Sequence, residues 1–326
     1  MSKYRVLLTG NHFRRTDPAH EKRLVDAGCE IVMSPYGRSA TESELIALLE
    51  GVDAVLASTD HFTKAVFAAS PRLKIVARWG VGYDAIDVDG ATEHGVWITT
   101  TPGTNEHSVA DATLTMILAI ARDVVEHVET TRAGKWDRLV GVELLDQTIG
   151  VIGFGRIGRQ VAIRASAFGM RVLAYDPVLS DQAIRDGGAE PATLEDVLRQ
   201  ADWVTLHAPS MPETHDLINA RTLAMCKKSA YIINTARGDL VNEDDLAEAL
   251  RSGTVAGAAL DVFKTEPIKS DNPLRSLPNV LPFPHIAGIT KQSSERMSAM
   301  CVDNILAVLA GHAATTPVNR PATPRH

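Results

Sequence analysis

The stretch TIGVIGFGRIGRQVA, residues 148–162, decides the fold of this chain. It begins as a short apolar strand, continues as Gly153-x-Gly155-x-x-Gly158 and runs on with the pattern of a helix. In a βαβ unit these glycines serve a tight turn, the close approach of a pyrophosphate, and helix–strand packing. The N–H groups at the start of such a helix bind phosphates. The stretch therefore predicts a dinucleotide site, although the glycines alone would also suit an ordinary strand–helix turn.

A carboxylate further along the chain supports the dinucleotide site. The next apolar run, RVLAY, ends at Asp176, which lies 18 residues beyond Gly158. An acidic side chain at about this distance binds the ribose hydroxyls of the adenosine. Asp176 would repel the 2′-phosphate of NADP, and Pro177 and Val178, which follow it, offer no compensating cation. The predicted cofactor is NAD.

Short apolar runs alternate with helical patterns on both sides of this motif. The runs are rich in Val and Ile and nearly continuous in hydrophobicity, as expected of strands buried on both faces of a parallel sheet. Besides residues 148–152, the expected strands are 4–9, 30–33, 53–57, 74–77, 171–175, 203–206, 230–234 and 255–260. This alternation predicts two doubly wound α/β domains with parallel sheets. We place their boundary near Thr101, before a long helical pattern that follows Thr104 and Asn105.

The composition fits a globular protein of this organisation. The 326 residues correspond to two domains of roughly 150 residues each, and 45% hydrophobic with 22% charged residues leaves no case for disorder. A net charge of -7 argues against nucleic acid or an anionic membrane as a partner. Three widely spaced cysteines predict neither a disulfide framework nor a metal site. Without a signal-peptide pattern or a membrane-spanning run, the expected location is the cytoplasm.

Three polar residues follow late strands of the second series. Arg237 lies in INTARGDLV, Glu266 in DVFKTEP and His285 in FPHIAG. Arginine offers a planar fork of donors for a carboxylate, histidine exchanges a proton near neutral pH, and a glutamate beside it favours the imidazolium. Together with a hydride acceptor, these groups indicate a 2-hydroxy acid dehydrogenase. Taken singly, Arg237 could also form a structural ion pair, Glu266 could be a solvated loop carboxylate, and His285 could be a core histidine.

Five motifs in this order resemble the D-isomer specific 2-hydroxyacid dehydrogenase family over nearly the whole chain. They are WGVGYDAIDVD, IGVIGFGRIGR with AYDP, LHAPSMPETHDLIN, INTARGDLVNEDDLAEAL, and DVFKTEP with PHIAG. The resemblance implies that Arg237 anchors the substrate carboxylate and polarises the carbonyl, that His285 is the acid/base, and that Glu266 is its partner. It also implies substrate contacts from Arg78 and from the backbone N–H groups of Val81 and Gly82.

The resemblance further implies the domain roles and the cofactor contacts. Residues 1–101 with 290–326 would form a flavodoxin-like substrate-binding domain, completed by a helix at about 291–310, and residues 102–289 a Rossmann NAD-binding domain. A homodimer built largely on the segment after Thr104 is expected. The implied cofactor contacts are Gly153, Gly155, Arg156, Ile157, Gly158, Asp176, His207, Ala208, Pro209, Thr214, Thr235, Ala236, Asp261 and Gly288.

Within the family, GKWDR, MCKKSAYIIN and AGAALDVF look closest to D-3-phosphoglycerate dehydrogenases. Two departures weaken that match. Residues 57–59 are Ala-Ser-Thr where an RSxT-type segment would supply an arginine for phosphate, and Ala85 replaces an asparagine. Arg14, Arg15 and Arg38 follow early strands and are candidate substitutes, or exposed loop arginines. Glyoxylate/hydroxypyruvate reductase, another 2-ketoacid reductase, and an NAD(H)-sensing corepressor-like binding protein remain as alternatives.

Overall fold

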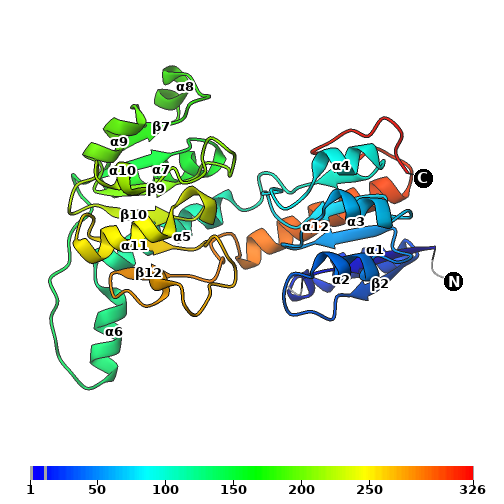
Figure 1. Ribbon diagram of the computed structural model, residues 1–326, viewed down its shortest axis with the longest axis horizontal. Helices are drawn as coiled ribbons and strands as arrows, with labels where there is room; N and C mark the ends of the chain where they lie inside the picture. Colours follow the sequence, from blue (N-terminus) through cyan, green and yellow to red (C-terminus); the bar gives the residue numbers. More distant parts are fainter. Residues whose placement is uncertain (1–2, 11–12, 326) are drawn as a thin grey trace. The chain divides into compact units, whose positions relative to one another are not determined.

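The computed structural model describes residues 3–10 and 13–325, which divide into two compact units (Figure 1). Unit 1 comprises Met1–Asn105 and Ile289–His326, and unit 2 comprises Glu106–Gly288. Each unit is built on a sheet whose described strand pairs are all parallel. The predicted fold class, two doubly wound α/β domains, is therefore confirmed.

Unit 1 holds a five-stranded sheet in the order β2-β1-β3-β4-β5. Its strands are β1 (Tyr4–Leu8), β2 (Cys29–Met33), β3 (Ala54–Ala57), β4 (Ile75–Arg78) and β5 (Trp97–Thr99), and its helices are α1 (Pro18–Asp26), α2 (Glu42–Leu48), α3 (Lys64–Ala69), α4 (Val88–Glu93) and α12 (Lys291–Leu309), with a 3-10 turn η1 (Phe13–Arg15). Because β1 pairs with both β2 and β3, the strand order reverses between β1 and β3. The carboxyl ends of these two strands form the topological switch point, where ligands bind in such sheets.

Successive residues of each strand in unit 1 enter opposite cores. Val6 and Leu8 of β1 pack on one face, with residues of α1 and α12, while Leu7 packs on the other, with residues of α2, α3 and α4. This burial on both faces explains the continuous hydrophobicity of the strands. Helix α12 lies beside this sheet, although it follows all of unit 2 in sequence (Figure 1). The expected return of a helix at about 291–310 is confirmed.

Unit 2 holds a seven-stranded sheet in the order β12-β11-β10-β9-β6-β7-β8. Its strands are β6 (Thr148–Ile152), β7 (Arg171–Tyr175), β8 (Glu190–Pro191), β9 (Trp203–Leu206), β10 (Tyr231–Asn234), β11 (Gly257–Leu260) and β12 (Val280–Pro282). Its helices are α5 (Glu106–Ala121), α6 (Val124–Arg132), α7 (Arg156–Ala167), α8 (Asp181–Asp186), α9 (Leu194–Gln200), α10 (Ala220–Leu223) and α11 (Glu243–Ser252), with 3-10 turns η2 (Gly238–Leu240) and η3 (Pro273–Arg275). The strand order reverses between β6 and β9, so the predicted glycine turn after β6 lies at the switch point of this sheet.

The structure differs from the sequence-based expectation in its short elements and in one helix. Strands β5, β8 and β12 were not expected, because two or three residues carry too little pattern to identify a strand. The long helical pattern after Asn105 forms two helices rather than one, since Asp123 between them adopts a left-handed conformation with φ of 47°. None of the helices in residues 3–10 and 13–325 combines the length and apolar character that crossing a membrane requires.

Candidate active site

The glycine turn after β6 is tightly packed at two glycines and open at the third. Gly153 has a φ of +89°, and a Cβ there would lie 2.5 Å from the amide nitrogen of Ala208. A Cβ on Gly158 would lie 2.3 Å from the carbonyl oxygen of Gly153, so α7 packs directly on the turn. A Cβ on Gly155 would meet nothing within 4 Å. The space beside Gly155, at the N-terminus of the 12-residue helix α7, is thus open to a phosphate.

The carboxylate of Asp176 is fixed against this turn. One oxygen accepts a hydrogen bond from the N–H of Phe154 at 2.9 Å, and the other accepts from Val178 at 2.9 Å and Leu179 at 3.2 Å. A carboxylate has about four lone-pair sites, so acceptor capacity is left for a ligand. Exposed Arg156 and half-buried Ile157 begin α7 between the turn and the solvent. Residues 153–158 and Asp176, predicted from sequence as parts of one dinucleotide site, therefore lie together.

The loop after β9 borders the same turn. The backbone of His207 and Ala208 lies against Gly153, and Thr214 holds the loop by donating to the carbonyl of Pro209 at 2.7 Å. The Nε2 of His207 lies 2.9 Å from the hydroxyl of Thr205, and Nδ1 has no hydrogen-bond partner within the described residues. Burial of the ring lowers the pKa of His207 to about 3. His207 is accordingly neutral throughout the physiological pH range.

A histidine–glutamate pair connects the loops after β11 and β12. His285 Nδ1 lies 2.6 Å from Glu266 Oε2, and Glu266 Oε1 accepts from the N–H of Phe263 at 3.0 Å. Burial acts to raise the pKa of Glu266, but the hydrogen bond and charge of His285, the Phe263 N–H and the charge of Arg237 outweigh it, so the pKa is lowered. An ionised carboxylate only accepts, so Nδ1 carries the proton of this bond. His285 Nε2 is left for proton exchange with a ligand.

The loop of His285 is held by Asp261, which is 1% exposed. The carbonyl oxygen of Asp261 accepts from the N–H of His285, and its carboxylate accepts from Ile286 and Ala287, each at 2.8 Å. Burial raises the pKa of the Asp261 carboxyl, against the effect of the two backbone hydrogen bonds. His285 adopts a left-handed conformation with φ of 55° under these restraints. Sequence reasoning proposed Asp261 only as a cofactor contact and missed this positioning role.

Arg237 follows β10 in a loop that Asn234 organises. Asn234 donates to the carbonyl of Arg237 at 2.8 Å and accepts from the N–H of Ala236 at 3.0 Å. A Cβ on Gly238 would lie 2.0 Å from the carbonyl carbon of Phe263, so the arginine loop packs on the loop that carries Glu266. The structure therefore brings Arg237, Glu266 and His285 into one cluster of unit 2. Sequence reasoning missed Asn234, although an asparagine at the end of a buried strand is a signal of such a brace.

Two further predicted contacts belong to unit 2. Thr235 is buried and its hydroxyl lies 3.2 Å from that of Thr113 on α5. Because the Thr113 hydroxyl donates to the carbonyl of Val109 at 2.8 Å, it accepts from Thr235. Gly288 is the last residue of the unit. Thr235 is thus held within the fold of unit 2 by its contact with α5.

In unit 1, the predicted substrate loop follows β4. The guanidinium of Arg78 donates to the carbonyl of Trp79 and lies so close to Gly80 that a Cβ there would be 2.8 Å from Nη1. Arg78 thus braces its own loop. Among the described residues, none accepts a hydrogen bond from the backbone N–H of Val81 or Gly82. These two N–H groups are available to an acceptor such as a carboxylate.

Comparisons with known proteins agree with this arrangement. Residues 114–287 match the family model described as "D-isomer specific 2-hydroxyacid dehydrogenase, NAD binding domain". Over 95% of its length the chain is 38% identical to a D-3-phosphoglycerate dehydrogenase of Methanocaldococcus jannaschii, of which it spans only 60%. Over 94% it is 38% identical to a glyoxylate reductase of Thermococcus kodakarensis, of which it spans 95%. The solved structure of the TT0316 protein from Thermus thermophilus superposes with a TM-score of 0.87 at 37% identity, covering 97% of this chain and 100% of that one.

The glycine turn yields a prediction with an internal control. Gly153→Ala should lower the free energy of unfolding by about 2 kcal/mol or more, because its Cβ meets backbone atoms and its φ is positive. Gly155→Ala should cost less than about 1 kcal/mol, since its Cβ enters open space. It should nevertheless weaken NADH binding about tenfold or more, because that space is where the phosphates approach. Urea unfolding and calorimetric titration with NADH measure the two effects, and wild-type affinity in Gly155→Ala would contradict the assignment.

Proposed function

Because the chain belongs to the D-isomer specific 2-hydroxyacid dehydrogenase family, we propose that it interconverts a D-2-hydroxy acid and its 2-keto acid with NAD as cofactor. The observation that carries the proposal is the 2.6 Å hydrogen bond between His285 and Glu266 beside Arg237. Bound NAD supplies the acceptor for the hydride of the hydroxy acid. The protein must then take up the hydroxyl proton, and His285 Nε2 is the group positioned to do so.

Each remaining group has a role that its chemistry supports. Arg237 anchors the substrate carboxylate and polarises the carbonyl, and the N–H groups of Val81 and Gly82 are further carboxylate donors. Ionised Glu266 stabilises the imidazolium that forms when His285 takes the proton. Unit 2 is the NAD-binding domain in this proposal, and unit 1 the substrate-binding domain. Reduction of a keto acid uses the same groups with the proton moving from His285 to the carbonyl oxygen.

Catalysis also separates this proposal from an NAD(H)-sensing binding protein of the same fold. A corepressor-like protein binds the dinucleotide without needing turnover, so bound NADH alone would not decide between them. Oxidation of NADH that depends on an added 2-keto acid would support the dehydrogenase. A screen over small 2-keto acids that finds NADH binding but no turnover with any of them would favour the binding protein.

The cofactor preference follows from the Asp176 carboxylate. NADH should give a much higher kcat/KM than NADPH, because the 2′-phosphate would meet this carboxylate without a compensating cation. Asp176→Asn removes the charge and keeps an acceptor oxygen, and it should shift the NADPH to NADH ratio of kcat/KM toward NADPH by about tenfold. Steady-state kinetics with both cofactors test this. Equal or better use of NADPH by the wild type would contradict it.

The acid/base pair gives a prediction in rate and in pH. His285→Ala should lower the rate of keto acid reduction about 10²- to 10⁴-fold, the usual contribution of a positioned general acid. Glu266→Gln should be milder, and its reduction rate should fall off at a lower pH than in the wild type, because the imidazolium loses its charged partner. His312→Ala, at an exposed position of unit 1, serves as the control, and its rate of keto acid reduction should equal that of the wild type. Near-wild-type turnover in His285→Ala would refute the assignment.

The carboxylate anchor is tested by changing its geometry while keeping its charge. Arg237→Lys should lose kcat as well as raise KM, because an ammonium lacks the two-point fork that orients the carbonyl. Arg251→Lys, at an exposed position on α11, should leave both constants unchanged. Methyl esters of the best keto acids should be very poor substrates of the wild type. Esters that turn over as well as the free acids would rule out a carboxylate site.

A homodimer is also part of the proposal. Helix α6 and the chain after it extend away from the sheet of unit 2 (Figure 1) and expose large apolar side chains, with Trp136 78%, Val140 95% and Leu145 58% exposed. Apolar surface of this kind is typical of protein–protein interfaces. Trp136→Asp with Val140→Asp should therefore give a monomer in sedimentation velocity, whereas Val25→Asp on α1 should remain a dimer. A wild type that sediments as a monomer at micromolar concentration would overturn the proposed homodimer.

A cytoplasmic location completes the proposal. Cys29, Cys226 and Cys301 are all free thiols. Burial raises the pKa of Cys226 to about 11 and that of Cys301 to about 12, so these thiols stay protonated and unreactive. Three unpaired cysteines suit a reducing compartment. Cell fractionation with detection in the cytosolic fraction tests the location.

A further inference from the structure

We propose that Glu243, the first residue of α11, is a positioning residue that holds Glu266 against His285. Its carboxylate accepts two hydrogen bonds from the loop that carries Glu266, one from the N–H of Lys264 at 2.7 Å and one from the side-chain amide of Asn272 at 2.6 Å. We call these three hydrogen-bonded residues the α11 brace. The inference rests on the proposed dehydrogenase function, because it gives Glu243 a part in the acid/base step of that reaction.

The α11 brace joins both ends of the loop. Lys264 lies two residues before Glu266, and Asn272 lies six residues after it. The side-chain oxygen of Asn272 accepts from the N–H of Leu274 at 3.0 Å, and Leu274 is fully buried in the core of unit 2. The far end of the loop is therefore fixed to the core. Because one carboxylate binds both ends, it determines where the residues between them lie.

The part of the loop next to Glu266 has little other support. Within the described residues, the backbone groups of residues 264–268 take part in no backbone–backbone hydrogen bond. The side chain of Lys264 forms an ion pair with Asp216 at 2.6 Å, but the two side chains are 36% and 44% exposed. An ion pair with this exposure contributes little to stability. The backbone that leads to Glu266 is therefore held mainly by the α11 brace.

The α11 brace also lies beside the arginine loop. Arg237 precedes Glu243 by six residues, and the 3-10 turn η2 lies between them. A Cβ on Gly238 would lie 2.3 Å from the amide nitrogen of Lys264, so the arginine loop packs on the N–H group that Glu243 binds. Residues 237–243 thus supply both the proposed carboxylate anchor and the support of Glu266.

The charges around Glu266 determine what its displacement would change. Burial acts to raise the pKa of Glu266, and the hydrogen bond and charge of His285, together with the charge of Arg237, outweigh this effect. Asp261 also interacts with His285 through its charge, but its carboxylate is bound to two backbone N–H groups. If Glu266 moved away from Nδ1, the imidazolium of His285 would lose its stabilising partner. His285 would then give up its proton at a lower pH.

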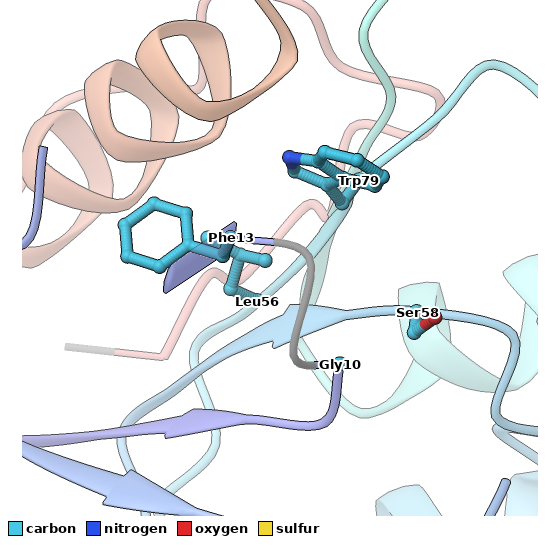
Figure 2. A pocket seen from close by; sticks show the side chains of 5 residues that line it. All are labelled: Gly10, Phe13, Leu56, Ser58 and Trp79. Carbon is cyan, nitrogen blue, oxygen red and sulfur yellow. The ribbon is translucent and has the colours of Figure 1, made fainter. Parts of the chain in front are cut away.

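All contacts of the α11 brace lie within unit 2. A change at Glu243 therefore leaves unit 1 as it is, including the small cavity shown in Figure 2, which is lined by Gly10, Phe13, Leu56, Ser58 and Trp79. The glycine turn and Asp176, the proposed NAD contacts, are also outside the brace. A variant at Glu243 should thus change kcat and its pH dependence rather than the KM for NADH.

The experiment replaces the carboxylate by an amide of the same shape. In Glu243→Gln, one acceptor becomes an NH₂ group that faces a donor of Lys264 or Asn272, whichever way the new side chain turns. The substrate is whichever of glyoxylate, pyruvate and hydroxypyruvate gives the wild type its highest kcat/KM with NADH. The kcat of reduction should fall about tenfold, and it should decline at a lower pH than in the wild type. A pH profile that is not shifted would overturn the inference, whatever the value of kcat.

A second substitution tests whether the two-point contact can be rebuilt. Asn272→Asp keeps the acceptor for the N–H of Leu274 but places a carboxylate against Glu243, and it should shift the pH profile as Glu243→Gln does. When both changes are combined, the introduced amide donates to the introduced carboxylate and its oxygen accepts from Lys264. The kcat and the pH profile should then return toward the wild type. A double variant no closer to the wild type than either single variant would overturn the inference.

Two controls separate positioning from a general effect on folding, with urea unfolding used to confirm that each variant is folded. Asp244→Asn removes an exposed carboxylate from the same first turn of α11 and should leave kcat and the pH profile unchanged. In a Glu266→Gln background, Glu243→Gln should shift the pH profile no further, because it acts through Glu266. A further shift of the same size would overturn the inference while leaving the dehydrogenase intact. A wild type that turns over none of the three keto acids would instead refute the proposed function, and the inference with it.

Discussion

The carboxylate of Asp261 is the constraint on which the catalytic cluster depends. It is buried at the end of β11, and two consecutive N–H groups of the His285 loop satisfy it while its carbonyl binds a third. An ionised group in such a place is tolerated only with hydrogen-bond partners, so the carboxylate and the loop require each other. His285, whose own N–H makes the third bond, has a left-handed conformation. Removing the carboxylate would free the loop of His285, the residue proposed to exchange the proton.

The same strategy recurs at the end of β10. Asn234 is fully buried and uses its amide to hold both sides of the arginine loop. Two short polar side chains, each the last residue of a strand or the one after it, thus fix the loops that carry Arg237 and His285. The two supporting residues stand at the ends of β10 and β11, strands whose residues are almost all buried and which are held by apolar packing. The side chains of Arg237 and His285 are therefore positioned by the sheet, although both lie in loops outside it.

Much of the fold and of the candidate site could be predicted from the sequence. The glycine turn and Asp176 were predicted because their spacing reflects local backbone geometry, and the structure places them together. Short strands such as β8 were not predicted, because two residues at the edge of a sheet form no hydrophobic pattern. The break between α5 and α6 at Asp123 was not predicted, because the sequences on both sides of it have a helical pattern. The support by Asp261 was not predicted because it joins residues that only the folded sheet brings together. The braces by Asn234 and Arg78 are local contacts, and they were not predicted because the sequence pattern does not give the direction of a side chain within its loop.

Two histidines of unit 2 lie in environments that differ in burial and in charge. His207 follows β9 at the switch point, but its ring is buried with Nε2 beside the Thr205 hydroxyl, and burial lowers its pKa to about 3. His285 follows β12 with its side chain 37% exposed and its Nδ1 bonded to Glu266. Glu266 in turn has a lowered pKa, so its charge persists as pH falls below the usual range of a carboxyl group. A charge that would stabilise an imidazolium is therefore present beside His285, and no described residue offers such a charge to His207. The environment of each ring, rather than its position at a strand end, is what favours the proposed acid/base role of His285 over one for His207.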